Sequence, residues 1–240
     1  MNYTEVQPEY CQHRSFVYRK FDNLSVTWSD INGYAAVVSI NDTELEIEYA
    51  QKMALCDLSH LQRIGFKGDG STEWLSSQQI TIPQNINTAE ISSNGCLAAR
   101  IGAQDILILD HLENKTNIKP ILEQQWNHDY TLNNHSCGYI MPRQDSHSCF
   151  YVCGVNAPEM FSTLCAVDLR INKFNNLMIA QTSLARINAI IIRCDAGETP
   201  GFYVLVENVS SEYCWDSLMD AMQDYSGQLI GLSCLIDLMS

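Results

Sequence analysis

Two stretches of the chain share one pattern, and this repeat restricts the folds that the sequence can adopt. FKGDGSTEWL at 66–75 aligns with VCGVNAPEMF at 152–161. Each contains the apolar end of a strand, a glycine, a turn, and then a helix with a glutamate before a bulky apolar pair. A shorter match relates LAARI at 97–101 to LARI at 184–187. The repeat predicts an α+β fold of two similar halves, with chance similarity as the alternative because the matches are short.

The 240 residues suffice for one large domain or two small ones. The predicted halves are 1–110, which begins with a polar arm at 1–30, and 136–240. Between them lies a polar, Asn-rich, linker-like segment at 111–135, with a short helix expected at Pro120–Trp126.

Hydrophobic patterning places the other elements within these halves. Helices are expected at 44–55, at 69–77 with Asp69 as N-cap, at 157–165 and at 211–225. In the last of these, Tyr213 and Trp215 cannot both face one core. Strands are expected at 34–40, 63–67, 96–101, 105–110, 137–141, 148–153, 182–187, 189–193 and 202–206.

Charge and apolar content exclude several classes of function. Lys and Arg number 14 against 28 Asp and Glu, for a formal charge of −14. Because such a chain repels phosphate, neither nucleic acid nor an anionic membrane is an expected partner. The longest apolar runs are far shorter than the roughly 20 residues that span a bilayer. The first residues carry no basic region followed by an apolar one, so ten reduced cysteines and a cytoplasmic location are expected.

Two groups of residues could carry chemistry. His135, Cys137, His147, Cys149 and Cys153 are of the types that bind zinc, but they form no C-x-x-C pair. Buried thiols and surface histidines are the favoured interpretation, and no metal site is predicted. Asp57-Leu58-Ser59-His60 holds all three residue types of a catalytic triad, but triads assemble from separated segments, which favours a simple turn.

Longer segments resemble a known superfamily. LCDLSHLQRIGFKGDGSTEWL (55–75) resembles the opening signature of the glycine-cleavage T-protein superfamily of folate-binding aminomethyltransferases. Four further segments are similar to the gamma subunit of heterotetrameric sarcosine oxidases: NGCLAARIGAQDILIL (94–109), CGVNAPEMFSTLCAVDLR (153–170), AQTSLARINAIIIR (180–193) and FYVLVENVSSEYCWDSLMDA (202–221). The resemblance spans roughly residues 45–235.

The resemblance implies an α+β fold of the aminomethyltransferase type and a place in a flavoenzyme of four subunits. Such an enzyme oxidatively demethylates sarcosine or a related N-methyl amine and passes the one-carbon unit to tetrahydrofolate. Flavin and tetrahydrofolate belong mainly to the large flavoprotein and the beta subunit, while gamma is chiefly an assembly component. The resemblance therefore implies no cofactor in this chain.

The chain departs from the catalytic pattern of the aminomethyltransferases at several positions. Their G-G-x-L-D-D strand matches a segment ending in Ala98 and Ala99, so both carboxylates are missing. In their R-x-G-Y-T-G-E-x-G-x-E pattern, Arg193 and Gly201 remain, but the final glutamate falls on Tyr203. No catalytic residue is therefore assigned. Arg193 is a candidate remnant of a folate pocket, and the alternative is an ion pair with Asp195 or Glu198.

A noncatalytic gamma-type subunit is accordingly the leading hypothesis. A stand-alone folate-dependent aminomethyltransferase or demethylase is the second. The third is a gamma-like subunit of another methylated-amine enzyme, such as an N-methylglutamate dehydrogenase or a dimethylamine monooxygenase. A zinc site is the fourth.

Overall fold

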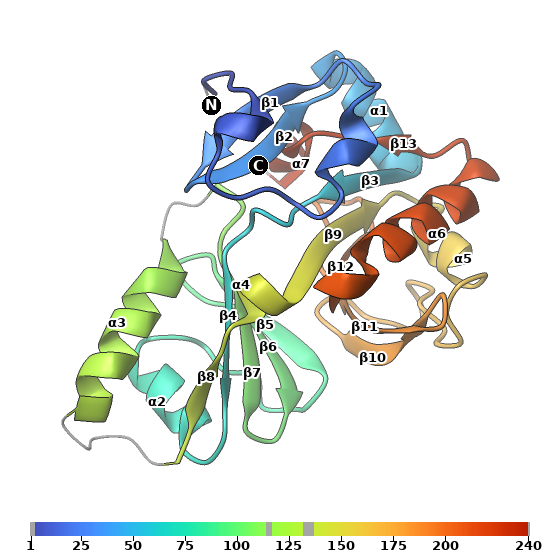
Figure 1. The fold of residues 1–240 in the computed structure, drawn as a ribbon. Helices are drawn as coiled ribbons and strands as arrows, with labels where there is room; N and C mark the ends of the chain where they lie inside the picture. The colour runs from blue at the N-terminus through green and yellow to red at the C-terminus, as the bar shows by residue number, and fades with distance from the viewer. Residues whose placement is uncertain (1–2, 114–116, 132–136, 240) are drawn as a thin grey trace. The chain divides into compact units, whose positions relative to one another are not determined.

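A computed structural model describes residues 3–113, 117–131 and 137–239. The chain divides into two compact units (Figure 1). The smaller unit holds Leu61–Ser146 and Leu177–Ile179, and the larger unit holds Met1–His60, His147–Asn176 and Ala180–Ser240. In the part of the chain that the structure describes, no helix is long and apolar enough to cross a membrane.

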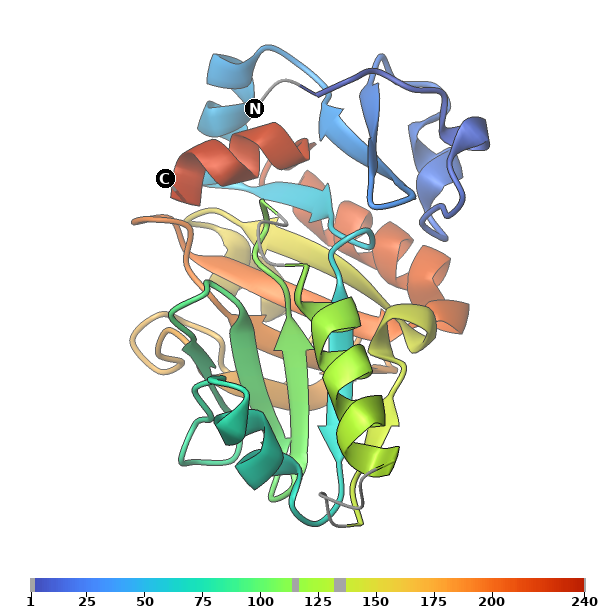
Figure 2. The ribbon, with the colours of Figure 1, turned by 90° about the vertical axis from the view of Figure 1, so that its left-hand side faces the viewer.

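The smaller unit is built on a five-stranded sheet in the order β5-β6-β7-β4-β8. Its strands are β4 (Arg63–Lys67), β5 (Thr88–Ile91), β6 (Leu97–Gly102), β7 (Asp105–Leu109) and β8 (Tyr139–Met141). Its helices are α2 (Ser71–Ser77), α3 (Ile118–Thr131) and α4 (Arg143–Ser146). Helices α2 and α3 cover one face of the sheet (Figure 2). The rings of Phe66, Trp74 and Trp126 lie within 5.2 Å of one another there, in an apolar cluster.

The larger unit contains a six-stranded sheet in the order β10-β11-β12-β9-β3-β13 and a separate hairpin of β1 and β2. The strands are β1 (Thr27–Ile31), β2 (Tyr34–Ser39), β3 (Ala54–Asp57), β9 (His147–Cys153), β10 (Ile179–Leu184), β11 (Ile187–Arg193), β12 (Gly201–Glu207) and β13 (Gln228–Leu229). The helices are η1 (Pro8–Tyr10), η2 (Tyr18–Phe21), α1 (Thr43–Lys52), α5 (Ala157–Phe161), η3 (Asn208–Ser210), α6 (Ser211–Gln223) and α7 (Leu232–Met239).

The two units repeat one topology, which confirms the α+β fold of two similar parts. In the smaller unit the chain runs β4-α2-β5-β6-β7, and β7 returns to pair with β4. In the larger unit it runs β9-α5-β10-β11-β12, and β12 returns to pair with β9. Gly68 and Gly154 follow the first strand of each repeat with φ of 106° and 118°. A Cβ on Gly154 would come within 2.4 Å of the Lys52 backbone, so this turn requires glycine.

The shorter sequence match, between LAARI and LARI, does not fall at equivalent positions of the two repeats. LAARI lies in β6, the second strand that follows the helix in its repeat. LARI begins at Leu184, the last residue of β10, and passes through a tight turn at Ala185 and Arg186, both with positive φ. The predicted strand at 182–187 is therefore wrong in its second half, because the left-handed turn ends β10.

The compact units follow different bounds from the predicted halves. Residues 1–60, which belong to the predicted N-terminal half, lie in the unit that contains most of the predicted C-terminal half. Strand β3 explains this, since it pairs antiparallel with β9, Ala54 opposite Cys153, and parallel with β13. The linker-like segment 111–135 contains helix α3, which buries Leu122 and Trp126 in the smaller unit. The helix expected at Pro120–Trp126 is thus confirmed and is longer than predicted.

Several predicted boundaries also shift for local reasons. The helix expected at 44–55 ends at Lys52, because Met53 is extended and the next residue opens β3. Helix α2 begins at Ser71 with Gly70 as N-cap, at φ 82°, so Asp69 is not the cap. The helix expected at 157–165 ends at Phe161.

Candidate functional site

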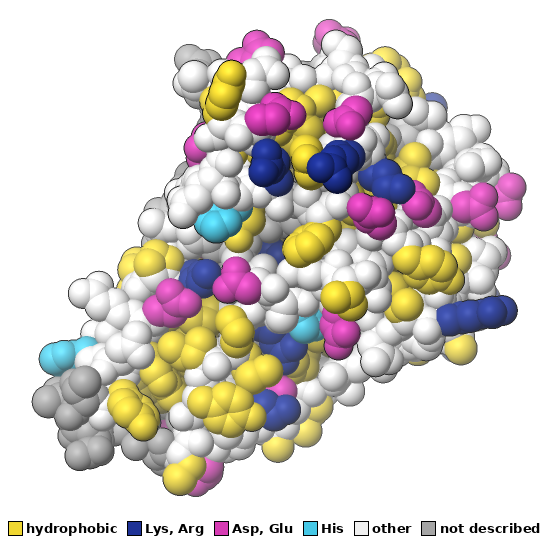
Figure 3. Space-filling model, viewed as in Figure 1, with side chains coloured by type: hydrophobic (Ala, Val, Ile, Leu, Met, Phe, Trp, Pro, Cys, Tyr) yellow, Lys and Arg dark blue, Asp and Glu magenta, His cyan; other side chains and the backbone are white. Residues whose placement is uncertain are grey.

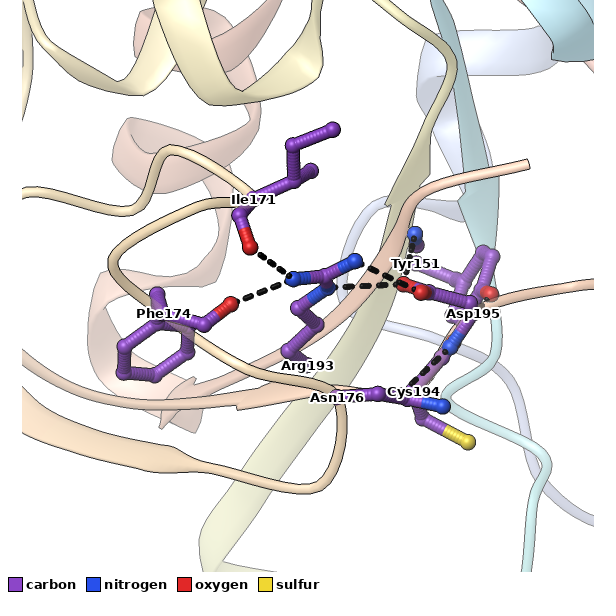
Figure 4. Close-up of polar contacts among 8 residues, drawn as sticks. Tyr151, Ile171, Phe174, Asn176, Arg193, Cys194 and Asp195 are labelled. Atoms are coloured by element: carbon purple, nitrogen blue, oxygen red, sulfur yellow. Dashed lines mark hydrogen bonds and ion pairs between the residues drawn. The ribbon is translucent and has the colours of Figure 1, made fainter. Parts of the chain in front are cut away.

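Arg193, the one candidate binding residue of the sequence, lies at the end of β11 with 8% of its surface exposed. Its guanidinium donates from Nε to Asp195 Oδ1 at 2.9 Å and from Nη2 to Asp195 Oδ2 at 2.7 Å. Nη1 donates to the carbonyls of Ile171 and Phe174 (Figure 4). The pair is bidentate, the strongest geometry of an arginine–carboxylate contact.

Asp195 extends this network into two loops. Its amide donates to Asn176 Oδ1 at 3.1 Å, and its Oδ1 also accepts from the amide of Gly201 at 3.2 Å. The chain between β11 and β12 and the loop at 171–176 are therefore tied to one ion pair. The predicted alternative of a pair with Asp195 is confirmed, whereas no ion pair with Glu198 is found among the described residues. Four of the five N–H groups of the Arg193 guanidinium therefore already donate hydrogen bonds.

Tyr203, which stands where the family pattern ends in glutamate, faces Tyr151 across β12 and β9. The two rings meet edge to face with centroids 5.0 Å apart, and both residues are buried. The Tyr151 hydroxyl donates to the carbonyl of Cys194 at 2.6 Å. Burial raises the pKa of both phenols well above 10, so both stay neutral at physiological pH. This position therefore packs in the core and supplies no negative charge.

Ala98 and Ala99 lie in the middle of β6 with no exposed surface. Ala98 belongs to the apolar cluster beneath α2 and α3, and it is opposite Ile108 of β7. Ala99 is opposite Leu107 and, on the other side, Ala89. A carboxylate at Ala98 would enter this apolar cluster, where an unpaired charge costs several kcal/mol.

The other candidate residues from the sequence are those of the possible triad and of the possible zinc site. Asp57 ends β3, and its Oδ1 accepts from the amide of Ser59 at 3.0 Å, which fits the predicted turn. Cys149 and Cys153 are buried on β9, whereas Cys137 is exposed. His135 lies outside the described residues. Across residues 3–113, 117–131 and 137–239, no three His, Cys, Asp or Glu side chains are grouped to hold a metal.

A depression that the sequence did not predict opens on the larger unit. It measures about 420 Å³ and lies over four adjacent strands. Its lining includes His147, Gln181, Thr182, Asn188, Leu205 and Glu207. The polar side chains could hydrogen-bond a small polar molecule. These residues come from distant parts of the chain, so no local motif could have indicated the depression.

The fold and these sites define an α+β protein built from two copies of a strand–helix–meander unit. The chain belongs to the family described as the GCVT N-terminal domain, which matches residues 27–238. No curated protein matches.

Two solved structures share the fold at low sequence identity. A chain of the heterotetrameric sarcosine oxidase from Corynebacterium sp. U-96, in complex with pyrrole 2-carboxylate, is 18% identical with a TM-score of 0.60. The match covers 77% of this chain and 93% of that one. The glycine cleavage system aminomethyltransferase T from Bartonella henselae is 13% identical with a TM-score of 0.71, covering 94% of this chain. This chain spans only 61% of that enzyme's length.

Proposed function

We propose that this chain is a noncatalytic, gamma-type subunit of a sarcosine oxidase-like heterotetramer. The observation that carries the proposal is the burial of Ala98 and Ala99, where the aminomethyltransferase pattern has two carboxylates. Methyl groups neither accept a proton nor bind a cationic amine. Oxidative demethylation of sarcosine or a related N-methyl amine would then take place on partner subunits.

The folate chemistry of the superfamily does not fit the residues present. Tyr203 is buried and neutral, and it occupies the position of the last glutamate in the pattern. Arg193 is held by Asp195 and by two backbone carbonyls, which leaves one N–H for any ligand. A pterin bound there would leave ring N–H donors unpaired, at about 1–3 kcal/mol each. We therefore assign flavin and tetrahydrofolate to the large flavoprotein and the beta subunit.

The fold likeness to a chain of the heterotetrameric sarcosine oxidase also supports a subunit role, since the match covers 93% of that chain with a TM-score of 0.60. A cytoplasmic location, where thiols stay reduced, is part of the proposal.

Co-expression tests the proposal directly. The chain is expressed alone and together with a sarcosine oxidase-like flavoprotein, beta subunit and small subunit encoded beside it. The proposal expects the chain alone to show no flavin absorbance and no oxidase activity, and expects it to co-purify with the flavoprotein in a fixed ratio. A stable monomer with no affinity for these partners would contradict it.

A stand-alone aminomethyltransferase or demethylase is the second candidate, favoured by the TM-score of 0.71 to aminomethyltransferase T. Titration of the lone chain with tetrahydrofolate, followed by tryptophan fluorescence, separates the two. Micromolar binding favours the second candidate. Co-purification with an N-methylglutamate dehydrogenase or a dimethylamine monooxygenase would instead indicate a related role in another methylated-amine enzyme.

A further inference from the structure

The N-terminal segment is folded, although it precedes the family match, which begins at residue 27. Phe21, at the end of η2, is 2% exposed. Its ring contacts Trp28 and Trp215 with centroids 5.6 and 5.4 Å away. Beside it, Lys20 Nζ donates to both carboxylate oxygens of Asp216 on α6, at 2.7 and 2.8 Å. The segment is therefore anchored to the family domain by an aromatic cluster and an ion pair.

The outward side of this segment combines positive charge with aromatic surface. We name Arg14, Phe16, Tyr18 and Arg19 the arm patch. The guanidinium carbons of Arg14 and Arg19 lie 5.3 and 5.2 Å from the centre of the Tyr18 ring. Phe16 is 56% exposed, while its neighbours in the sequence are buried. Stacking on one ring holds both guanidinium groups in place before any partner arrives.

The two arginines of the arm patch form no ion pair within the described residues. Neither Arg14 nor Arg19 has a carboxylate within ion-pair distance, although the chain has 28 acids. Five other basic side chains are in ion pairs: Lys20, Lys67, Arg143, Arg170 and Arg193. Among the described residues, Lys52, Lys119, Lys173 and Arg186 are also without an ion pair. Arg14 and Arg19 differ from these four side chains because both lie over one aromatic ring, and this combination of cations and aromatic surface fits a negatively charged ligand. Figure 3 shows Lys and Arg side chains gathered over the N-terminal part of the chain, with hydrophobic side chains among them and Asp and Glu side chains beside them.

We propose that the arm patch docks a short acidic segment of a partner protein. A guanidinium fork matches a carboxylate, and Tyr and Arg are among the residue types that dominate binding energy at interfaces. Nucleic acids and anionic membranes present extended negative charge, which two arginines cannot offset against a net charge of −14. A protein segment needs to bring only a few carboxylates. This inference rests on the proposed function only in identifying the partner as a subunit of the heterotetramer.

The first test measures binding of fluorescein-labelled tri-glutamate, a peptide with only a few carboxylates, to the full-length chain at low salt. The arm patch is reversed by Arg14→Glu together with Arg19→Glu. The control, Lys173→Glu with Arg186→Glu, changes the net charge equally at exposed positions elsewhere on the larger unit. We expect the arm variant to bind at least about tenfold more weakly than the control, because two charge-assisted contacts are lost. Equal affinities, or no binding by the unmodified chain, would overturn the proposal.

A neutral double variant tests the role of the guanidinium groups, and two other anionic ligands test the choice of partner. Arg14→Gln with Arg19→Gln removes the charge without reversing it, and it must also weaken binding if the guanidinium groups make the contacts. Circular dichroism checks that each variant is folded. Binding of single-stranded oligonucleotide or phosphatidylserine vesicles, lost in the same variants while tri-glutamate does not bind, would overturn the choice of partner.

The complex separates this inference from the proposed function. If the unmodified chain co-purifies with the flavoprotein and the arm variant co-purifies equally well, the docking role fails while the subunit role stands. If the unmodified chain finds no such partner but binds tri-glutamate through the two arginines, the subunit role fails and the docking role stands.

Discussion

The guanidinium of Arg193 and the carboxylate of Asp195 form a bidentate ion pair, with side chains 9% and 17% exposed. We predict that Arg193→Leu lowers the free energy of unfolding by about 3–5 kcal/mol, because a largely buried carboxylate and two carbonyls lose their donors. Arg193→Lys keeps the charge but not the fork, so a smaller loss is expected. Urea denaturation measures both. Arg186→Leu, at an exposed turn, is the control and should change stability by less than about 0.5 kcal/mol.

The second prediction concerns the missing carboxylates. Ala98→Asp should lower the free energy of unfolding by about 3–5 kcal/mol, since it buries an unpaired charge in the apolar cluster of the smaller unit. Ala103→Asp makes the same change at an exposed position of the β6–β7 turn and should be nearly neutral. Thermal denaturation at pH 7 compares the two. Equal stability of both variants would show that β6 tolerates the ancestral acid, which would weaken the case for a noncatalytic role.

Local patterns in the sequence predicted the repeated parts of this fold. Each strand–glycine–helix segment is contiguous, and its glycine adopts the left-handed backbone that a turn of this kind requires. The hairpin of β6 and β7 and the long helix α6 followed from apolar spacing in the same way. On α6, Trp215 is buried and Tyr213 exposed, so the two aromatics do not share one core.

Local sequence patterns could not predict which distant strands pair with each other. Ala54–Asp57 is too short to show a strand period, and its partners β9 and β13 lie about a hundred residues or more along the chain. The Arg193–Asp195 pair was foreseeable as an alternative because its members are two residues apart. The two carbonyls that complete it, those of Ile171 and Phe174, come from a loop whose position depends on tertiary packing.

The third prediction tests how the N-terminal segment is anchored. Phe21→Ala removes a buried ring from contact with Trp28 and Trp215 and should cost about 3–5 kcal/mol or release the segment. Limited trypsin digestion reports release, because Arg14, Arg19 and Lys20 become better substrates. Phe16→Ala is the matched control, since that ring is mostly exposed. If digestion of Phe21→Ala is no faster than that of Phe16→Ala, the aromatic cluster is not the anchor.

The fourth prediction concerns thiol reactivity. All ten cysteines are free, and Cys137 is the exposed one. Burial raises the pKa of the Cys194, Cys214 and Cys234 thiols to about 12, so they remain protonated at pH 8. DTNB should therefore label one thiol rapidly in the native protein and all ten in denaturant. Cys137→Ser should abolish the fast phase, and a fast phase of several thiols would contradict the burial.

The last prediction follows from the same thiols and gives stability a dependence on alkaline pH. For Cys194 the folded pKa is about 12, raised by desolvation and then by the charge of Asp195, against an ordinary value near 9.0. The unfolded thiol therefore loses its proton first, so its contribution is complete below pH 9 and is lost as pH rises toward 12. Each such group contributes a slope of up to about 1.4 kcal/mol per pH unit in that window. Denaturation between pH 7 and 11 should show falling stability. Cys194→Ala should flatten the curve, whereas Cys137→Ala, which removes an exposed thiol, should not; identical curves for both variants would refute the assignment.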